Sequence, residues 1–233
     1  MENIKNIFYN QIKNAPSENI IKEIRIDWTQ HAIGIHNIAK SICSEFQIDN
    51  RNRTILKLML LYFSGSQMFA DELKAATGSD GSLNKGLMIV GGVGTGKSLL
   101  FKIFKEYTRE IIYANSFKYY NSVDIIDNCN VSGTKYLEMF SNNFDNNSPK
   151  PMVCYIDDIA SKNETVKHFG TELNVIEQLL SLRYNVFQRY GKLTHCTSNK
   201  YPTELDKIYD IRIGDRIKEM FNIIELSGDS FRK

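Results

Sequence analysis

A glycine-rich octapeptide near the middle of the chain has the residue types of a phosphate-binding loop. Its residues are Gly91, Gly92, Val93, Gly94, Thr95, Gly96, Lys97 and Ser98. They fit the pattern G-x-x-x-x-G-K-[ST], in which backbone N–H groups surround the phosphates of a nucleotide. In that pattern Lys97 brings an ammonium to the outer phosphates, and Ser98 offers a hydroxyl to Mg²⁺. The octapeptide therefore predicts a site for ATP and Mg²⁺, and we assign nucleotide contacts to the residues from Gly91 to Leu99.

The segments on either side of this loop fit the same prediction. The apolar run Gly86–Val90 is typical of a buried parallel strand, and a helical pattern over 97–110 follows the loop. A strand, a glycine turn and a helix N-terminus direct N–H groups and the positive end of the helix dipole at one point. The alternative is a plain glycine turn with Lys97 in solvent. It is disfavoured because both flanking segments are those that a phosphate site requires.

Two carboxylates follow a second apolar strand pattern, which spans residues 152–156. Asp157 is the predicted Mg²⁺-binding acid, together with Ser98, because a phosphate loop needs an acid on a neighbouring strand. Asp158 is the predicted residue that orients or deprotonates the attacking water, and Glu164 is a weaker alternative base. Without the phosphate loop, the same pair would indicate only a polar turn after a strand.

A third strand pattern, residues 193–198, ends in Asn199. An asparagine at the tip of a strand beside the phosphate loop can hydrogen-bond the γ-phosphate or its attacking water. We therefore include Asn199 with Lys97, Asp157 and Asp158 among the candidate catalytic residues. A role as a helix cap or turn residue is equally open at this point.

The order of the remaining patterns predicts how these residues are brought together. Five strand candidates (86–90, 117–122, 151–157, 192–198 and 222–226) alternate with helical patterns at 97–110, 123–129, 134–142, 172–190 and 213–220. This alternation predicts an α/β fold, a P-loop NTPase core with a five-stranded parallel sheet flanked by helices. Ligands in such folds bind beyond the carboxyl ends of the strands, where the glycine loop lies.

The first third of the chain has a different pattern. Residues 1–63 are predicted to be helical, with a polar break at 49–53, and residues 65–84 are rich in turn formers. We therefore divide the chain into a small N-terminal helical region, 1–80, and a nucleotide-binding domain, 81–233.

Composition narrows the classes of protein that the chain can be. Its 233 residues are 42% hydrophobic and carry a net charge of +2, so DNA binding would need a local basic surface. The four cysteines are far apart and form no C-x-x-C pair, which favours reduced thiols. The sequence shows no signal peptide and no run of 18 apolar residues. We therefore expect a cytoplasmic protein that does not enter a membrane.

The segment from Gly86 to Arg232 resembles the DnaC/IstB-like branch of the AAA+ ATPases, and is most similar to bacterial and phage helicase loaders. The resemblance rests on Asn84-Lys85-Gly86-Leu87 and the phosphate loop together with Asp157-Asp158-Ile159, Arg183-Tyr184, Thr194-His195-Cys196-Thr197-Ser198-Asn199, Arg216-Ile217-Lys218-Glu219-Met220 and Gly228-Asp229-Ser230-Phe231-Arg232. The phosphate loop is common to many families, whereas the combination with the last two segments is fairly specific.

The resemblance implies an arginine finger that acts on the neighbouring subunit. Arg216 matches that position and would be catalytic in trans, so the protein would assemble into a ring or helical oligomer. Arg212 is the competing candidate, Arg183 is a further interface candidate, and Arg232 would be a second basic contact. The short segment after Asn199 leaves no room for a C-terminal lid domain. Asp158 replaces the more common glutamate, a difference that implies slow hydrolysis.

The resemblance also implies a function and partners. It suggests an ATP-hydrolysing protein that assembles on DNA and loads a replicative helicase during DNA replication, with the N-terminal region docking the helicase. Single-stranded DNA would be contacted around Lys118, Tyr119, Tyr120, Lys135 and Tyr136, although these aromatic residues would equally well pack under the sheet edge. The alternatives are an IstB-like helper ATPase of transposition and a nucleotide-gated scaffold that hydrolyses little ATP.

Overall fold

The computed structural model describes residues 28–111, 117–141, 152–161, 163–168, 171–228 and 230–231. These residues form two compact units, each with its own internal contacts. One unit comprises the residues up to Leu83 and those of the helix that continues from Leu99. The other comprises Asn84–Ser98 and the residues from Phe117 onward.

The first unit is helical. Its elements are α2 (Trp28–Ile42), α3 (Arg53–Phe63), α4 (Met68–Thr77) and the part of α5 (Lys97–Ile111) from Leu99 onward. Helix α3 forms the centre of this unit, because almost every residue from Ile55 onward is buried and a helix that is apolar all round must be covered on all sides. Phe63 of α3 stacks on Phe104 of α5, with ring centroids 5.4 Å apart.

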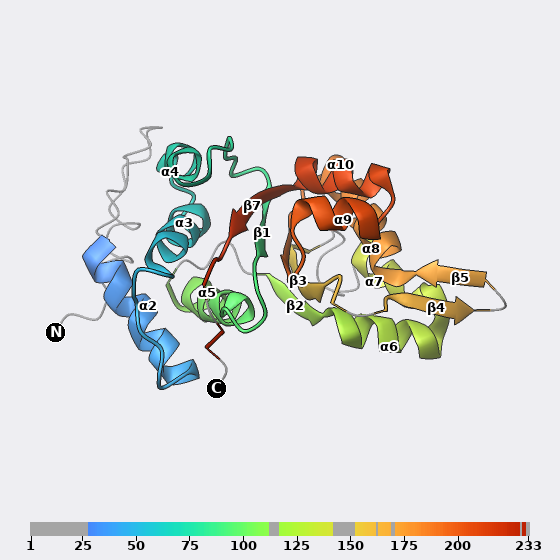
Figure 1. The fold of residues 1–233 in the computed structure, drawn as a ribbon, viewed down its shortest axis with the longest axis horizontal. Helices are drawn as coiled ribbons and strands as arrows, with labels where there is room; N and C mark the ends of the chain where they lie inside the picture. The colour runs from blue at the N-terminus through green and yellow to red at the C-terminus, as the bar shows by residue number, and fades with distance from the viewer. Residues whose placement is uncertain are drawn as a thin grey trace, which may run out of the picture. The chain divides into compact units, whose positions relative to one another are not determined.

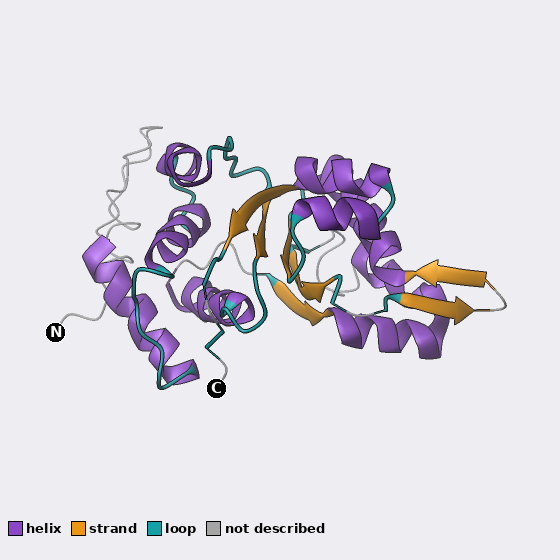
Figure 2. Ribbon diagram, viewed as in Figure 1, coloured by secondary structure: helices purple, strands orange, loops and turns teal. Residues whose placement is uncertain are grey.

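The second unit contains the predicted parallel sheet (Figures 1 and 2). The strands lie in the order β2-β3-β6-β1-β7, and every neighbouring pair is parallel. Their bounds are β1 (Gly86–Val90), β2 (Lys118–Asn121), β3 (Cys154–Ile159), β6 (Thr194–Ser198) and β7 (Phe221–Glu225). This order places β6 between β1 and β3. The residues that follow these three strands therefore meet at one edge of the sheet.

A buried apolar core fixes the sheet within this unit. Met88, Ile156 and Cys196 contribute one side of it from β1, β3 and β6, and helices contribute the other. These elements are α6 (Ser122–Ser132), a 3₁₀ turn (Gly133–Leu137), α7 (Glu138–Ser141), α8 (Val175–Tyr190), α9 (Pro202–Ile208) and α10 (Ile211–Met220). None of the helices in the described ranges has the length and apolar character that crossing a bilayer requires.

The structure differs from the sequence prediction at α4, which lies within the segment 65–84 predicted to be rich in turns, and also before α8 and after β6. Residues 172–174, predicted as the start of a helix, belong to β5 (Thr171–Asn174), which pairs antiparallel with β4 (Thr165–His168). Helix α8 begins only at Val175, because the Asn174 side chain caps it by accepting a hydrogen bond from the Glu177 N–H. Helix α9 was not predicted, although Pro202 at its first turn is a common start signal.

Candidate nucleotide-binding site

The glycine loop turns sharply between β1 and α5, as its composition predicts. Gly94 and Gly96 have φ angles of 81° and 96°, a region that side-chain-bearing residues rarely occupy. Gly91 is required for a second reason, because a Cβ there would lie 2.2 Å from the carbonyl oxygen of Leu226. Farther along the tail, the Phe231 N–H donates to the Gly94 carbonyl. Arg232, the predicted second basic contact, lies outside the described residues.

Lys97 lies under the loop, and its side chain joins the predicted polar groups into one network. Its Nζ donates to the carbonyl oxygens of Gly91 and Gly92 at 2.8 and 2.7 Å, and to Oδ1 of Asn199 at 2.7 Å. The amide Nδ2 of Asn199 then donates to Oδ1 of Asp158 at 2.7 Å. Asn199 thus bridges the ammonium of the loop and the second strand-end carboxylate.

The carboxylate of Asp157 is surrounded by hydroxyl groups. Its Oδ1 accepts hydrogen bonds from Ser98, Tyr155 and Thr197 at 2.7, 2.6 and 2.6 Å, and its Oδ2 accepts one from Tyr119 at 3.1 Å. Burial, and then the charge of Asp157, raise the pKa of Tyr155 well above its ordinary value. The phenol therefore stays protonated and remains a donor at neutral pH.

The donor set at Ser98 and Asp157 fits magnesium. Mg²⁺ prefers hard oxygen ligands and usually keeps water and substrate phosphates in its coordination shell. The Ser98 hydroxyl and the Asp157 carboxylate supply two such oxygens 2.7 Å apart, beside the turned backbone of the loop. The residues present therefore suit a nucleotide with its magnesium ion.

Asp158 lies in an unusual backbone conformation. Its φ is 60°, and the pairing of β3 with β6 shifts register between Ile156 and Ile159. Its N–H donates to Oγ1 of Thr197 at 2.9 Å, and its carbonyl accepts from the Ser122 hydroxyl at 2.8 Å. The side chain is half-buried and faces Asn199.

Glu164, the weaker candidate for the base, contacts a different set of groups. Its Oε1 accepts from the Ala160 N–H at 2.7 Å, and its Oε2 accepts from the Tyr209 hydroxyl at 2.8 Å. Burial raises the pKa of this carboxyl to about 7. These contacts connect the turn after β3 to Tyr209, so in this structure the Glu164 carboxyl stabilises the fold.

Comparisons with known proteins test the fold. The sequence matches no known protein-family profile and no curated protein. A proposed primosome component from Streptococcus pyogenes serotype M3 superposes with a TM-score of 0.52 at 16% identity, over 82% of this chain and 87% of that one. The DnaC helicase loader gives 0.50 at 17% identity, over 79% and 95%. DnaI gives 0.50 at 18% identity, over 84% and 93%.

The chain has a DnaC-like fold. The predicted P-loop core with its five-stranded parallel sheet is thereby confirmed.

Within this DnaC-like fold, Arg216 lies on α10 and contacts α8. Its Nη1 donates to the Ser181 hydroxyl at 3.0 Å, and its guanidinium carbon lies 4.9 Å from the centre of the Tyr184 ring. Arg212, the competing finger candidate, is paired instead with Asp210 at 3.0 Å and is exposed. Neither contact involves the glycine loop of the same chain, and the assignment of the finger stays a prediction.

Arg183, the further interface candidate, is buried instead. Only 1% of its surface is exposed, and its Nε donates to the Thr194 hydroxyl at 2.8 Å. Its Nη atoms donate to backbone carbonyls, with distances of 2.8 Å to Phe140, 3.1 Å to Met152 and 3.0 Å to Leu193. The expectation that Arg183 faces a neighbouring subunit is wrong for this conformation, because its donors are used within the fold.

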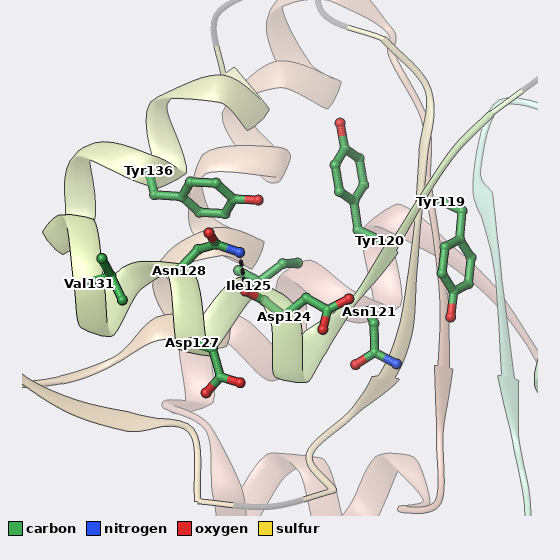
Figure 3. Close-up of a pocket in the computed structure, with 9 residues that line it drawn as sticks. All are labelled: Tyr119, Tyr120, Asn121, Asp124, Ile125, Asp127, Asn128, Val131 and Tyr136. Carbon is green, nitrogen blue, oxygen red and sulfur yellow. Dashed lines mark hydrogen bonds between the residues drawn. The ribbon is translucent and has the colours of Figure 1, made fainter.

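The predicted DNA-contacting tyrosines line a surface cavity of about 460 Å³ (Figure 3). Figure 3 shows the rings of Tyr120 and Tyr136 on the same side of α6 as Asp124, while the carboxylate of Asp127 points the other way. Both rings also pack against Phe140, with centroid distances of 4.7 and 6.0 Å. No lysine or arginine is among the described residues that line the cavity. Packing accounts for Tyr120 and Tyr136, while the Lys118 ammonium lies 5.9 Å from the centre of the Tyr120 ring, and the DNA contact stays a prediction.

The hydroxyl groups around Asp157 are not evident from the local sequence patterns. Tyr155 precedes Asp157 by two residues on β3, so their side chains share a face of the sheet. Tyr119 and Thr197 belong to the strands on either side of β3. The i, i+2 spacing could have identified Tyr155, whereas the other two required knowledge of the strand order.

Proposed function

We propose that this protein binds ATP with Mg²⁺, hydrolyses the ATP, assembles on DNA and loads a replicative helicase during DNA replication. One observation carries the nucleotide part of the proposal. At the carboxyl ends of β1, β3 and β6, hydrogen bonds join the loop lysine through Asn199 to Asp158, and a further bond joins the loop serine to Asp157. A P-loop ATPase needs these residue types at this place.

Each residue of the network has a proposed role. The residues from Gly91 to Leu99 bind the phosphates, and Lys97 exchanges its carbonyl contacts for phosphate oxygens. Ser98 and Asp157 hold Mg²⁺, which supplies neutralisation of charge on the phosphates. Asp158 orients or deprotonates the attacking water, and Asn199 links that carboxylate to the state of the loop lysine.

Arg216 is the proposed finger, acting on the site of the next subunit in a ring or helical oligomer. Its half-buried guanidinium rests on the Tyr184 ring at the surface of α8 and α10. An arginine supplied from a neighbour stabilises charge on the transferring phosphoryl group, and it makes turnover depend on assembly.

The partners are proposed from the likeness in fold to the DnaC helicase loader and DnaI. Residues 1–80 would dock the helicase, and residues 81–233 would bind nucleotide and single-stranded DNA in the cytoplasm. A nucleotide-gated scaffold is the second candidate, and Asp158 favours it. An aspartate is shorter than the usual glutamate, and this one is already bonded to Asn199.

Nucleotide titration of the purified full chain tests the first step. We expect Lys97→Ala to weaken MgATP binding about 100-fold, because it removes a charge-assisted contact to phosphate. Lys102→Ala, at an exposed position of α5, is the matched control and should bind like the wild type. Equal affinity in Lys97→Ala and Lys102→Ala would overturn the assigned site.

Turnover assays separate the ATPase from the scaffold. If the protein is an ATPase, Asp158→Asn should bind MgATP normally and hydrolyse it about 100-fold more slowly. Arg216→Ala should lose the rise of specific activity with protein concentration, whereas Arg212→Ala should keep it. Wild-type turnover no faster than that of Asp158→Asn would leave the scaffold as the function. Loss of the concentration dependence in Arg212→Ala alone would transfer the finger to Arg212.

Affinity capture with the full chain identifies the client protein. The immobilised wild type is incubated with an extract of its source cells in MgATP, with Lys97→Ala as the control. Retention of a hexameric helicase by the wild type alone supports loading. Retention of a transposase in its place overturns it in favour of a transposition helper.

A further inference from the structure

We infer that Thr197 is a positioning residue that holds both strand-end carboxylates toward the phosphate loop. This inference rests on the proposed function, because it concerns the same magnesium and water sites. Thr197 lies one residue before the end of β6, and only 1% of its surface is exposed. Its hydroxyl contacts Asp157 and Asp158 at the same time.

The two carboxylates need a special backbone in order to face one loop. Consecutive residues of a regular strand point to opposite faces of a sheet. Here Asp157 bonds the Ser98 hydroxyl, and Asp158 bonds Asn199, which in turn bonds Lys97. Both acids therefore face the phosphate loop, and the strand cannot have its regular alternation at this point.

The departure from alternation is visible in the backbone of Asp158. Its φ of 60° is a left-handed conformation, and the register between β3 and β6 shifts across it. Aspartate adopts this conformation more readily than most residues with a side chain, but the conformation still costs free energy that local hydrogen bonds offset. The contacts that hold the Asp158 backbone come from Thr197 on one side, at 2.9 Å, and Ser122 on the other, at 2.8 Å.

The Thr197 hydroxyl acts as a donor to one acid and as an acceptor from the other. A hydroxyl has one proton to donate and lone pairs that accept. The short contact of 2.6 Å assigns the Thr197 proton to Oδ1 of Asp157, while a lone pair accepts from the Asp158 N–H. Tyr155 lies 3.2 Å away, but it donates its own proton to Asp157 at 2.6 Å. The Thr197 hydroxyl therefore contacts both acids, Asp157 as a donor and Asp158 as an acceptor.

A set of three variants separates positioning from packing. Thr197→Val keeps the shape and removes both hydrogen bonds, while Thr197→Ser keeps the hydroxyl and removes a methyl group. Ser198→Ala is the matched control, because the Ser198 hydroxyl is equally buried on the same strand but has other partners, the Ile159 carbonyl at 2.9 Å and the Lys200 N–H at 3.0 Å. The variants are compared as full chains by thermal unfolding and by titration with a fluorescent ATP analogue, in EDTA and in MgCl₂.

We expect the gain in nucleotide affinity on adding Mg²⁺ to fall about tenfold or more in Thr197→Val, because outer-shell partners orient the metal-binding groups. Affinity in EDTA should stay within about twofold of the wild type in all three variants, since the loop amides are unchanged. Thr197→Ser should show the same gain in nucleotide affinity on adding Mg²⁺ as the wild type. Ser198→Ala should keep the gain even where its unfolding temperature falls.

Two outcomes overturn this inference alone. One is that the wild type gains nucleotide affinity on adding Mg²⁺, but Thr197→Val gains as much as Ser198→Ala does. The other is a Thr197→Ser variant as impaired as Thr197→Val, which would assign the effect to the methyl group. A wild type that binds no nucleotide in Mg²⁺ overturns the proposed function itself, and this result is distinguishable because it precedes any comparison of variants.

Discussion

A buried charged side chain lies at each end of strands β3 and β6: Arg183 of α8 at the amino ends and Asp157 of β3 at the carboxyl ends. The two ends differ in what surrounds the charge. At the amino ends Arg183 is 1% exposed, and at the carboxyl ends Asp157 is 5% exposed. Both are partnered mainly by neutral groups: carbonyls for the guanidinium and hydroxyls for the carboxylate. Burying either charge is costly unless such partners satisfy it.

The difference lies in what those partners belong to. The acceptors around Arg183 are backbone carbonyls of the fold and one buried hydroxyl, so the network ends within the core. The network around Asp157 continues outward through the half-buried Ser98 and Tyr119 to the phosphate loop and the edge strand. A buried charge therefore does not by itself indicate a functional site. An opening toward a preformed binding loop does.

Replacing Arg183 should have the largest effect on stability. Arg183→Met removes the guanidinium donors from the carbonyls of Phe140, Met152 and Leu193, of which Leu193 keeps only a long bond of 3.4 Å from the Cys154 N–H. We expect a loss of about 3–5 kcal/mol in the free energy of unfolding, measured by urea titration. The fraction that stays folded should bind nucleotide as the wild type does.

Arg189→Met is the control, because it removes an exposed arginine from the same helix and should change stability by no more than about 0.5 kcal/mol. Equal stability of the two variants would contradict the structural role of the amino-end cluster.

The same contrast shows what the sequence could predict. The phosphate loop and the apolar strand patterns are local features, so they predicted the sheet, and the order of its strands brings Asn199 to Lys97. Arg183 could not be placed, because a polar residue in an amphipathic helix is normally exposed, and only packing assigns it to the core. The contacts of Thr197 and Tyr119 with Asp157 depend on the positions of β6 and β2 on either side of β3, which no local pattern specifies.

The short strands β4 and β5 could not be predicted from the sequence for a related reason. The hairpin of β4 and β5 has only four residues per strand, too few for the alternation of a strand to stand out from the helical pattern that follows. The boundary is set by one side chain, the Asn174 cap, rather than by hydrophobic periodicity.

Glu164→Gln should have the next largest effect, and only across a range of pH. Burial raises the pKa of Glu164 from 4.5 to about 7 in the folded protein. Between these values the folded state keeps a proton that the unfolded state has released, so this group's contribution to stability falls as the pH rises. We expect Glu164→Gln to gain about 3 kcal/mol relative to the wild type between pH 4 and pH 8.

Urea titrations of both proteins at several pH values measure that difference, from which the other titrating groups cancel. A difference that stays constant with pH would mean that Glu164 is ionised in the fold.

Asp157→Asn should have the opposite pattern to Arg183→Met: little change in stability, and a clear loss in Mg²⁺-dependent nucleotide binding. The amide oxygen can still accept from the Tyr155 and Thr197 hydroxyls, and a buried charge is removed. Stability should therefore change by no more than about 1 kcal/mol. The gain in nucleotide affinity on adding Mg²⁺ should fall about tenfold, because a neutral oxygen is a weaker ligand. A stability loss as large as that of Arg183→Met would make both clusters structural.

Tyr119→Phe should have the smallest effect and tests how far the carboxyl-end network extends. The Tyr119 hydroxyl donates to Asp157 over 3.1 Å from the edge strand, and its ring lines the surface cavity. Asp157 keeps its three closer donors in this variant. We therefore expect the gain in Mg²⁺ to fall only about two- to threefold, and stability to change by no more than about 0.5 kcal/mol.

Tyr120→Phe is the matched control, because Tyr120 lines the same cavity from the same strand while its ring packs on Phe140. Nucleotide titrations of the two variants, with and without Mg²⁺, decide between two extents of the site. An effect confined to Tyr119→Phe places the edge strand within the metal-binding network. Equal effects would limit that network to β3, β6 and the phosphate loop, and Tyr119 would then be part of the cavity wall alone.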